Sequence, residues 1–334
     1  MRTLITGGAG FIGTNLASHL LEKRRKVIIF DNLSRLGSEK NLFWLKDNFG
    51  DKFTFLKADI RNREKVNAAV KGVDVVYHLA AQVAVTKSLD DPITDFEINA
   101  TGTLNLLEAV RRFRPQATVI FASTNKVYGA LEGLRIQEKE TRYLLPDYPE
   151  GIDERTNISF YSPYGCSKGA ADQYAIDYSR IYGLKTVVFR QSCIYGFHQF
   201  GNEDQGWVAY LTLCGLKNKE ITIYGDGKQV RDILFVDDLI SAFLAAESKA
   251  EKIKGEVFNI GGGKENTISL LELLAWLKRR LRKKIKYRFS HWRPGDQKVY
   301  VSDLSKAKRE LGWCPMIKKE EGLGKLLSWL KENI

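Results

Sequence analysis

Short apolar runs alternate with segments of helical periodicity over roughly the first 190 residues of the chain. The runs that we interpret as strands are residues 4–6, 26–30, 53–57, 73–79, 118–122 and 185–189. Strands that read as continuous apolar runs between helices are typical of a parallel sheet covered on both faces. The pattern therefore predicts an α/β fold with a doubly wound parallel sheet.

The alternation breaks up in the second part of the chain. Gly- and aromatic-rich stretches at residues 197–206, 225–227 and 261–263 surround short helical segments. Loop-rich regions of this kind commonly carry binding surfaces. For the 334 residues we expect a first domain over residues 1–190 and a smaller substrate-binding lobe over residues 191–334, with some segments of the lobe returning to the first domain.

A glycine-rich loop joins the first strand to the first helix. Its sequence is Gly7-Gly8-Ala9-Gly10-Phe11-Ile12-Gly13. Gly8, Gly10 and Gly13 fit G-x-G-x-x-G, whereas Gly7, Gly10 and Gly13 fit the G-x-x-G-x-x-G variant. Either pattern lets the backbone close on a pyrophosphate at a helix N-terminus, which predicts a Rossmann-type dinucleotide site.

The second strand ends in Asp31, 18 residues after Gly13. A carboxylate at this place accepts hydrogen bonds from the adenosine ribose hydroxyls and repels a 2′-phosphate. NAD is therefore predicted over NADP. The alternative is a tight turn in an unrelated α/β protein, but strand, glycine loop, helix, strand and acid occur here in the order that a dinucleotide site requires.

Tyr164 and Lys168 follow Ser162-Pro163, a typical helix start with serine at the cap and proline in the first turn. Residues four apart lie on one helix face, so we expect a phenol beside an ammonium. At an effective dielectric of about 20 and roughly 5 Å, this charge lowers a tyrosine pKa by about two units. A second Tyr-x-x-x-Lys, Tyr224 to Lys228, spans a Gly-Asp-Gly turn, and its side chains need not meet.

The net charge of +12 raises the question of nucleic acid, most sharply at residues 278–286. This basic run continues a helix that Ser269 and Glu272 are expected to cap, so its charges fill a solvated last turn. We expect no nucleic-acid partner. A diffuse positive field would instead steer an anionic nucleotide substrate.

Cysteine and histidine spacing indicates neither a disulfide framework nor a metal site. Cys166, Cys193, Cys214 and Cys314 show no C-x-x-C pattern, and the four histidines show no H-x-x-x-H pattern. The sequence also shows no signal peptide and no 18-residue apolar run. We therefore expect a cytoplasmic protein without metal and without a membrane partner.

These motifs, taken in their order along the chain, resemble those of a known protein family. The sequence resembles the extended short-chain dehydrogenase/reductase family, the nucleotide-sugar epimerases and dehydratases, over essentially its whole length. The matching segments are the glycine loop, Asp31-Asn32-Leu33-Ser34, Asp59-Ile60, His78-Leu79-Ala80-Ala81, Asn99, Ser123-Thr124 to Tyr128-Gly129, Tyr164 to Lys168, Arg231-Asp232 and Arg293 to Asp296.

The resemblance implies roles for individual residues. Asp59 and Ile60 would contact the adenine, Leu79 to Ala81 the nicotinamide half, and Lys168 the nicotinamide ribose. Arg231 and Arg293 would hold the diphosphate of a nucleotide sugar, and a surface ion pair is the alternative for either arginine. The expected catalytic residues are Thr124, Tyr164 and Lys168. The other expected NAD contacts are Gly7, Gly10, Phe11, Ile12, Gly13, Asp31, Asn32, Arg35, Asn99 and Ser123, and the other expected substrate contacts are Asn125, Lys126 and Asp296.

Asn125 and Lys126 discriminate among the activities of the family. The 4,6-dehydratases carry an acid and a base, Asp-Glu, at these positions. An amide cannot protonate a leaving hydroxyl, and a lysine reverses the local charge, so the pair argues against dehydration. The combination of residues 123–129, 162–174 and 204–208 resembles the 2-epimerase branch of the family, which acts on CDP-linked hexoses. A 4-epimerase or another nucleotide-sugar dehydrogenase is the alternative. A non-catalytic NAD-binding protein would typically lose the Tyr-Lys pair.

The resemblance also implies a homodimer or homotetramer. Two helical segments, residues 95–112 and 164–181, carry more apolar positions than one sheet face needs. We expect these segments to pair with their symmetry mates in a four-helix interface.

Overall fold

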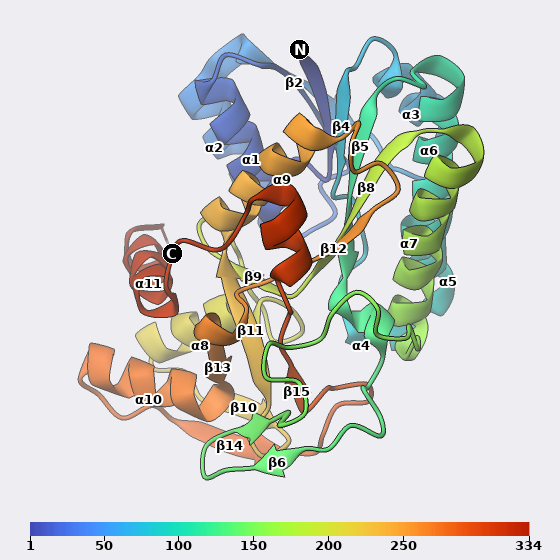
Figure 1. Ribbon diagram of the computed structural model, residues 1–334. Helices are drawn as coiled ribbons and strands as arrows, with labels where there is room; N and C mark the ends of the chain where they lie inside the picture. Colours follow the sequence, from blue (N-terminus) through green and yellow to red (C-terminus); the bar gives the residue numbers. More distant parts are fainter. Residues whose placement is uncertain (334) are drawn as a thin grey trace.

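The computed structural model describes residues 1–333. Its largest sheet has seven strands in the order β12-β8-β5-β4-β1-β2-β3, and all of its pairings are parallel (Figure 1). This α/β architecture confirms the predicted Rossmann-type sheet. The strands are β1 Arg2–Thr6, β2 Lys26–Asp31, β3 Phe53–Lys57, β4 Val75–His78, β5 Thr118–Thr124, β8 Lys185–Gln191 and β12 Val257–Ile260.

Helices cover both faces of this sheet (Figure 1). Ile5 and Ile29 pack under α1 and α9, whereas their neighbours Leu4 and Ile28 pack under α3, α6 and α7. This is the alternation of side chains expected of strands buried on both faces. The helices associated with the sheet are α1 Phe11–Glu22, α2 Ser38–Phe49, α3 Arg63–Val70, α4 Val85–Asp90, α5 Pro92–Phe96, α6 Gly102–Phe113, α7 Ser162–Tyr182 and α9 Val236–Lys249, with short turns η1 Gly50–Lys52, η2 Glu97–Thr101 and η3 Asn125–Tyr128.

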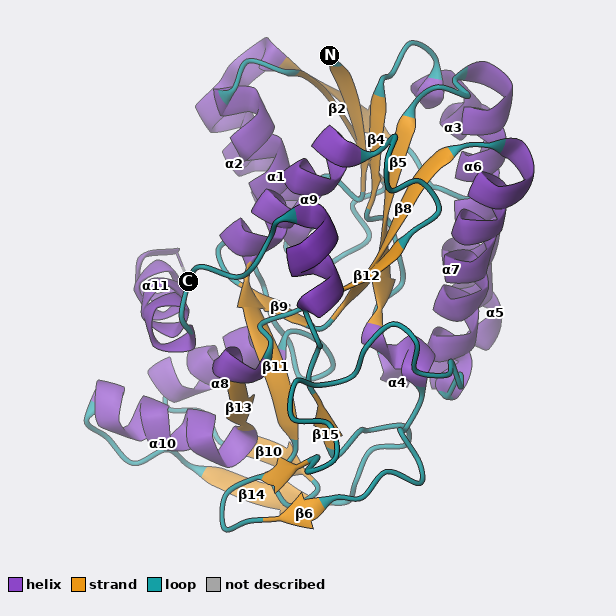
Figure 2. Cartoon of the chain, in the orientation of Figure 1, coloured by secondary structure: helices purple, strands orange, loops and turns teal. Residues whose placement is uncertain are grey.

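The remaining elements form a smaller, loop-rich lobe below the carboxyl ends of the strands (Figure 2). In one of its sheets β13, β11 and β15 are neighbours and β9 also pairs with β11, and in another β10 pairs with β14. The elements of the lobe are β9 Cys193–Tyr195, β10 Ile221–Tyr224, β11 Val230–Phe235, β13 Thr267–Ser269, β14 Tyr287–Ser290, β15 Val299–Tyr300, α8 Trp207–Leu216, α10 Leu270–Leu281, α11 Lys319–Asn333, η4 Lys264–Asn266 and η5 Ala307–Leu311.

The chain crosses between the two parts in both directions. β12 and α9, from the second half of the sequence, complete the large sheet and cover one of its faces. In the other direction, the small hairpin β6 Gln137–Glu138 and β7 Tyr143–Leu144 packs on the lobe, since the N–H of Tyr143 donates to Lys228 O at 3.0 Å. β12 and α9 thus belong to the large sheet although they follow residue 190, and the division into a first domain over residues 1–190 and a lobe over residues 191–334 stays a prediction.

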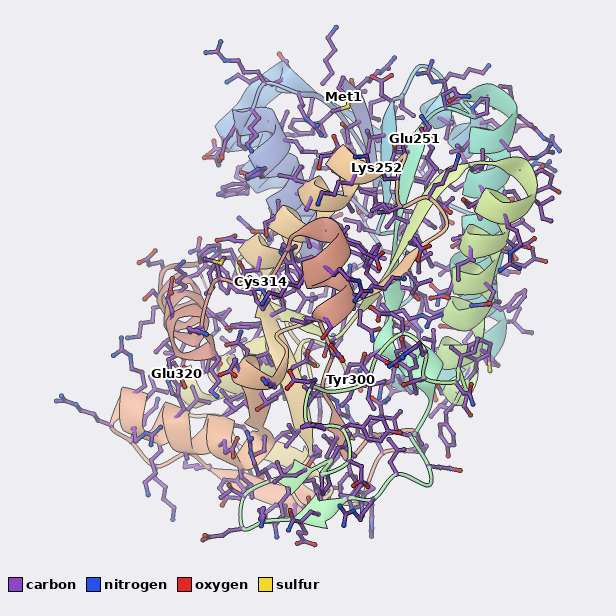
Figure 3. All side chains as sticks on the ribbon, in the orientation of Figure 1. Met1, Glu251, Lys252, Tyr300, Cys314 and Glu320 are labelled. Carbon is purple, nitrogen blue, oxygen red and sulfur yellow. The ribbon has the colours of Figure 1, made fainter. Side chains whose placement is uncertain are left out.

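Tyr300 lies in the interior where the sheet and the lobe meet (Figure 3). Its ring stacks on Tyr128, with ring centroids 6.1 Å apart, and the Tyr128 hydroxyl donates to Asn259 Oδ1 at 2.8 Å. Because Tyr128 belongs to η3, Asn259 to β12 and Tyr300 to β15, these contacts fix the lobe against the end of the sheet.

The basic run at residues 278–286 has the setting that the sequence predicts. Ser269 and Glu272 form a capping box at the start of α10, and Lys278, Arg279 and Arg280 occupy its last turn. All four cysteines are free thiols. In residues 1–333 no helix combines the length and the apolar character needed to cross a membrane. The same residues contain no cluster of three or more His, Cys, Asp or Glu side chains able to hold a metal ion.

Candidate active site

A cavity of about 840 Å³ lies between the carboxyl ends of the strands of the large sheet and the lobe. This is where ligands bind in open α/β sheets. All but one of the residues predicted from the sequence to bind cofactor or substrate line it, and the exception is Asn99. The lining includes Gly7, Gly10, Phe11, Ile12, Gly13, Asp31, Asn32, Arg35, Asp59, Ile60, Leu79, Ala80, Ala81, Ser123, Thr124, Asn125, Lys126, Tyr164, Lys168, Arg231, Arg293 and Asp296.

The glycine loop is packed so closely that side chains are excluded from it. A Cβ atom on Gly13 would lie 2.3 Å from Gly7 O, and one on Gly7, whose φ is +71°, would lie 2.7 Å from Ala80 N. Gly8 lies under β2 instead, where a Cβ would lie 2.8 Å from Ile29 Cγ2. Gly7, Gly10 and Gly13 line the cavity and Gly8 does not, so the G-x-x-G-x-x-G pattern describes the cavity wall.

Asp31 ends β2 at the rim of this loop. Its carboxylate accepts from the N–H of Ala9 at 3.0 Å and from the N–H of Leu33 at 2.8 Å. Burial raises the pKa of Asp31, and these backbone donors lower it. The two backbone bonds hold the carboxylate in one orientation beside Gly10, as recognition of a ribose requires.

The residues expected at the adenine form a polar cluster on the far side of Asp31. Asn32 Nδ2 donates to Asp59 Oδ2 at 2.9 Å, and Arg61 Nε donates to Asp59 Oδ1 at 3.0 Å. Asp59 and the buried Ile60 border the cavity. Arg35 also borders the cavity; burial lowers the pKa of its guanidinium, and the charges of Tyr164 and Asp204 raise it.

Asn99 lies behind the cavity wall, on the π-helical turn η2, and is 1% exposed. Its side chain pairs with both backbone groups of Gln82: the N–H of Gln82 donates to Asn99 Oδ1 at 2.9 Å, and Asn99 Nδ2 donates to Gln82 O at 3.0 Å. The structure thus gives Asn99 no place on the cavity surface. It anchors the segment that follows Leu79 to Ala81.

The helix that carries Tyr164 and Lys168 begins one residue before the predicted start, with Tyr161 rather than Ser162 at the cap. α7 starts at Ser162, Pro163 stands in its first turn, and the Ser162 Oγ accepts from the N–H of Gly165 at 3.2 Å. Ser162 itself has φ +72°, in the left-handed region that serine seldom adopts. The second Tyr-x-x-x-Lys pair is separated as expected, since Tyr224 donates to Glu203 and Lys228 to Glu138.

Tyr164 and Lys168 are both buried at the cavity, at 7% and 3% exposure. Burial raises the pKa of Tyr164 to about 12; the hydroxyl of Thr124 and the charge of Arg35 lower it, whereas Asp95 raises it. The prediction of a lowered tyrosine pKa is thus wrong for the protein chain by itself, because desolvation of the phenolate outweighs the favourable contacts.

Lys168 directs its ammonium group at the sheet. Nζ donates to Ala122 O at 2.6 Å and lies 4.2 Å from the centroid of the Phe121 ring. Burial lowers the pKa of Lys168 to about 7, and the carboxylates of Asp172 and Asp95 raise it. The lysine is therefore held by β5, and two buried acids, one on α7 and one on α5, favour its charged form.

The substrate side of the cavity contains three cations: Lys126 and Arg231 lie at Asp296, and Arg293 lies 3.6 Å from Asp204. Arg231 Nη2 donates to Asp296 Oδ1 at 2.7 Å, and Lys126 Nζ lies 4.0 Å from the same oxygen and donates to Gly295 O at 3.2 Å. Burial, together with the charge of Arg231, lowers the pKa of Lys126 to about 8. Arg293 lies with its guanidinium carbon 3.8 Å from the centroid of the Tyr224 ring. This side of the cavity has the charge and the donors that a diphosphate requires.

Comparison with known proteins places this geometry in a family. The family model described as GDP-mannose 4,6 dehydratase matches residues 4–326. CDP-paratose 2-epimerase from Salmonella typhi is 47% identical, over 98% of this chain and 99% of that protein. A putative UDP-glucose 4-epimerase from Methanocaldococcus jannaschii is 35% identical, over 99% of this chain and 98% of that protein.

The chain belongs to the extended short-chain dehydrogenase/reductase family of nucleotide-sugar epimerases and dehydratases. The structure of UDP-glucuronic acid 4-epimerase from Bacillus cereus, in complex with UDP-glucuronic acid and NAD, has a TM-score of 0.87 and 29% identity, covering 100% of both chains. This family is NAD-dependent. The glycine loop, which no Cβ fits, and the oriented Asp31 carboxylate suit NAD in this chain.

The sequence analysis missed several polar residues of this family member's site. Asp95 is fully buried and Gln82 half-buried at the cavity wall, and the buried Ser167 lies between Tyr164 and Lys168 on α7. The only signal for Asp95 was its position four residues before Asn99, which places both on one helix face. Nothing in the local sequence indicates that Ser167 meets them, because 72 residues separate it from Asp95.

Proposed function

We propose that the protein inverts the configuration at C2 of a nucleotide-linked hexose, of the CDP-paratose and CDP-tyvelose type or CDP-glucose. The observation that carries this proposal is the pair of the buried Asn125 and the half-buried Lys126, which line the cavity beside Thr124 where a dehydratase has its acid and base. The 47% identity to CDP-paratose 2-epimerase supports it.

The charge around Lys126 argues against dehydration. Elimination of water needs a carboxylic acid to protonate the leaving hydroxyl and a carboxylate to remove a proton from carbon. Asn125 supplies only an amide, whose Nδ2 donates to Gln297 Oε1 at 3.4 Å. Lys126 is next to Arg231, and its bond to Gly295 O directs the ammonium at a backbone carbonyl. A pair of this composition can bind hydroxyl and phosphate oxygens of a sugar nucleotide.

The catalytic step requires a base at the hydroxyl that is oxidised. NAD, when bound, accepts a hydride from the sugar and returns it, and its oxidised ring brings a positive charge to the site. Tyr164 takes the proton of the C2 hydroxyl, and Thr124 donates to the same oxygen. Lys168, fixed by Ala122 O and favoured in its charged form by Asp172 and Asp95, stabilises the phenolate. Arg231 and Arg293 retain the diphosphate while the 2-keto sugar presents its other face.

Product analysis by carbon position tests the assignment. We expect incubation with CDP-glucose to give the C2 epimer, CDP-mannose, and incubation with GDP- and UDP-glucose to proceed more slowly. A 4-epimerase would instead give the galactose derivative from one of these substrates, and a dehydrogenase would accumulate an oxidised sugar and NADH. Either result would contradict C2 inversion while leaving the NAD site unchanged.

The purified protein is expected to contain bound NAD, because a redox-neutral cycle regenerates the cofactor in place. Denaturing the protein and assaying the supernatant for dinucleotide measures this. Gly13→Ala, whose Cβ would lie 2.3 Å from Gly7 O, is expected to lose most of the NAD, whereas Gly324→Ala, where a Cβ has no neighbour within 4 Å, keeps it. Finding no NAD in the parent protein, with activity that depends wholly on added NADP, would contradict the cofactor assignment.

We also propose that the protein forms a homodimer, or a tetramer built from such dimers, through α5, η2, α6 and α7. These neighbouring helices expose Ile93, Phe96, Tyr174 and Ile181 at 72%, 52%, 45% and 61%. Apolar side chains exposed on neighbouring helices favour association.

Sedimentation at micromolar concentration is expected to show a species of at least twice the 38.0 kDa chain mass. Tyr174→Glu should shift the protein towards the monomer, because it places a charge in the interface. Tyr287→Glu is the matched control: this tyrosine is also 45% exposed, but it lies on β14 in the lobe. A parent protein that sediments only as a monomer would rule out the interface.

A further inference from the structure

Asp95, at the wall of the cavity, is a fully buried carboxylate with three side-chain donors. Gln82 Nε2 donates to its Oδ1 at 2.8 Å, Asn99 Nδ2 donates to the same oxygen at 3.1 Å, and the Ser167 hydroxyl donates to Oδ2. A buried carboxylate that accepts this many bonds holds its partners in fixed positions, since each unmade bond would leave a desolvated polar group.

The groups that donate to Asp95 belong to two segments, the helix that carries Tyr164 and Lys168 and the segment that borders the cofactor side of the cavity. Ser167 lies on α7 between Tyr164 and Lys168. Gln82 directly follows Leu79 to Ala81, and Asn99 pairs with both of its backbone groups. Asp95 therefore links the helix that carries the tyrosine and lysine to the segment that borders the cofactor side of the cavity.

A second contact holds the same end of α7. The N–H of Tyr164 donates to Ser88 Oγ at 3.1 Å, and the Ser88 hydroxyl donates to Val85 O at 2.7 Å. Ser88 lies on α4, directly after the segment that Gln82 begins, and is fully buried. The backbone of Tyr164 and the side chain of Ser167 are thus both tied to residues 82–99.

The charge of Asp95 acts on both groups of the Tyr164–Lys168 pair. It raises the pKa of Lys168 and raises the pKa of Tyr164. The other groups facing the pair are Arg35 and Thr124 at Tyr164, and Asp172 and His78 at Lys168. Burial and the charge of Lys168 lower the pKa of His78 to about 3, so His78 is neutral over the range in which the enzyme works.

We propose that Asp95 is a positioning residue for the reaction: its carboxylate orients Ser167 and Gln82 and keeps α7 in register with the cofactor side of the cavity. The inference rests on the proposed function in taking Tyr164 and Lys168 as the catalytic pair.

The variant Asp95→Asn keeps the shape of the side chain and removes its charge. We expect kcat to fall on the order of tenfold, with KM for the sugar nucleotide within about twofold, because the substrate contacts are unchanged. Without the negative charge, Tyr164 loses its proton at lower pH and Lys168 does so too. Both limbs of the pH profile of kcat are therefore expected to move to lower pH. Asp90→Asn, an exposed acid on the neighbouring α4, is the matched control and should leave the profile unchanged.

A titration of Tyr164 in the holoenzyme checks the same inference without turnover. The tyrosinate absorbance of the parent minus that of Tyr164→Phe gives the ionisation of Tyr164, and the same difference is measured in the Asp95→Asn background. We expect the ionisation at lower pH in that background. This outcome does not depend on which carbon is epimerised, so a failure of the proposed function leaves it standing. An unchanged titration and unchanged limbs would overturn the role of Asp95.

Ser167→Ala tests the link if Asp95→Asn does not fold. This variant removes one donor and keeps the carboxylate, so kcat is expected to fall about fivefold or more while both limbs stay in place and NAD is retained. A kcat equal to that of the parent would show that the contact between α7 and Asp95 has no part in positioning Tyr164.

Discussion

Replacing Tyr164 by Phe is expected to reduce turnover on the order of a hundredfold or more, which is the usual loss when a general base is removed. The phenol is the buried acid–base group that faces the hydroxyl of Thr124 in the cavity, whereas Lys168 is occupied by Ala122 O. Binding of the sugar nucleotide should change little, since its charged diphosphate is expected at Arg231 and Arg293. Single-turnover kinetics and equilibrium binding of the nucleotide diphosphate measure the two effects separately.

Tyr182→Phe is the control for this substitution. Tyr182 ends the same helix, is 50% exposed and lies outside the cavity, so loss of its hydroxyl should leave turnover unchanged. If Tyr164→Phe kept more than half of the parent activity, Tyr164 would have no place in the mechanism. A loss of nucleotide binding as large as the loss of turnover would instead indicate a disturbed cavity.

The sheet was predictable because its signals are local. β3 covers the predicted residues 53–57, and β5 and β8 each run two residues beyond the predicted ends, to Thr124 and Gln191. Apolar runs and glycine turns act over a few residues, so the sequence shows them directly. The hairpin β6–β7 was not predicted, because its strands have two residues each and pack on the lobe through long-range contacts such as Arg142 Nη2 with Glu272 Oε2 at 2.7 Å.

The sequence predicted which residues line the candidate site, but it did not predict their pKa values or their long-range ion pairs. The motif dictates the positions of Gly7 and Gly13, which admit no Cβ, and of the carboxylate of Asp31 at the end of a strand. The structure brings these residues to one cavity. The pKa of Tyr164 depends instead on burial, which spacing does not reveal. Asp172 shows the same limit: it forms a buried ion pair with Arg190 at 2.9 Å, and Ser123 donates to it at 2.7 Å, across 18 and 49 residues of sequence.

A substrate deuterated at C2 is expected to keep its label at C2 in the product, and solvent deuterium should not enter that position. If one substrate molecule is oxidised and reduced without release, the hydride that leaves C2 is the hydride that returns. Direct deprotonation is excluded chemically, because C2 lies next to no carbonyl and no residue of the cavity is a base strong enough for so weak an acid. Mass spectrometry of the product, formed from labelled substrate in H₂O and from unlabelled substrate in D₂O, measures both quantities.

The outcomes of this experiment separate the possible routes by the atom that carries the label. Solvent deuterium at C2 would contradict transient oxidation at that carbon. That result would place the transient ketone at C3 instead, because a carbonyl at C3 makes the proton on C2 acidic, and Tyr164 or Lys126 would be the base that removes it. Lys126, whose pKa is lowered to about 8 by burial and by Arg231, is neutral in a substantial fraction of molecules near that pH. Lys126→Met would abolish the exchange if Lys126 is this base and would retain it if Tyr164 is, whereas under transient oxidation at C2 the same variant retains the label and affects only substrate binding.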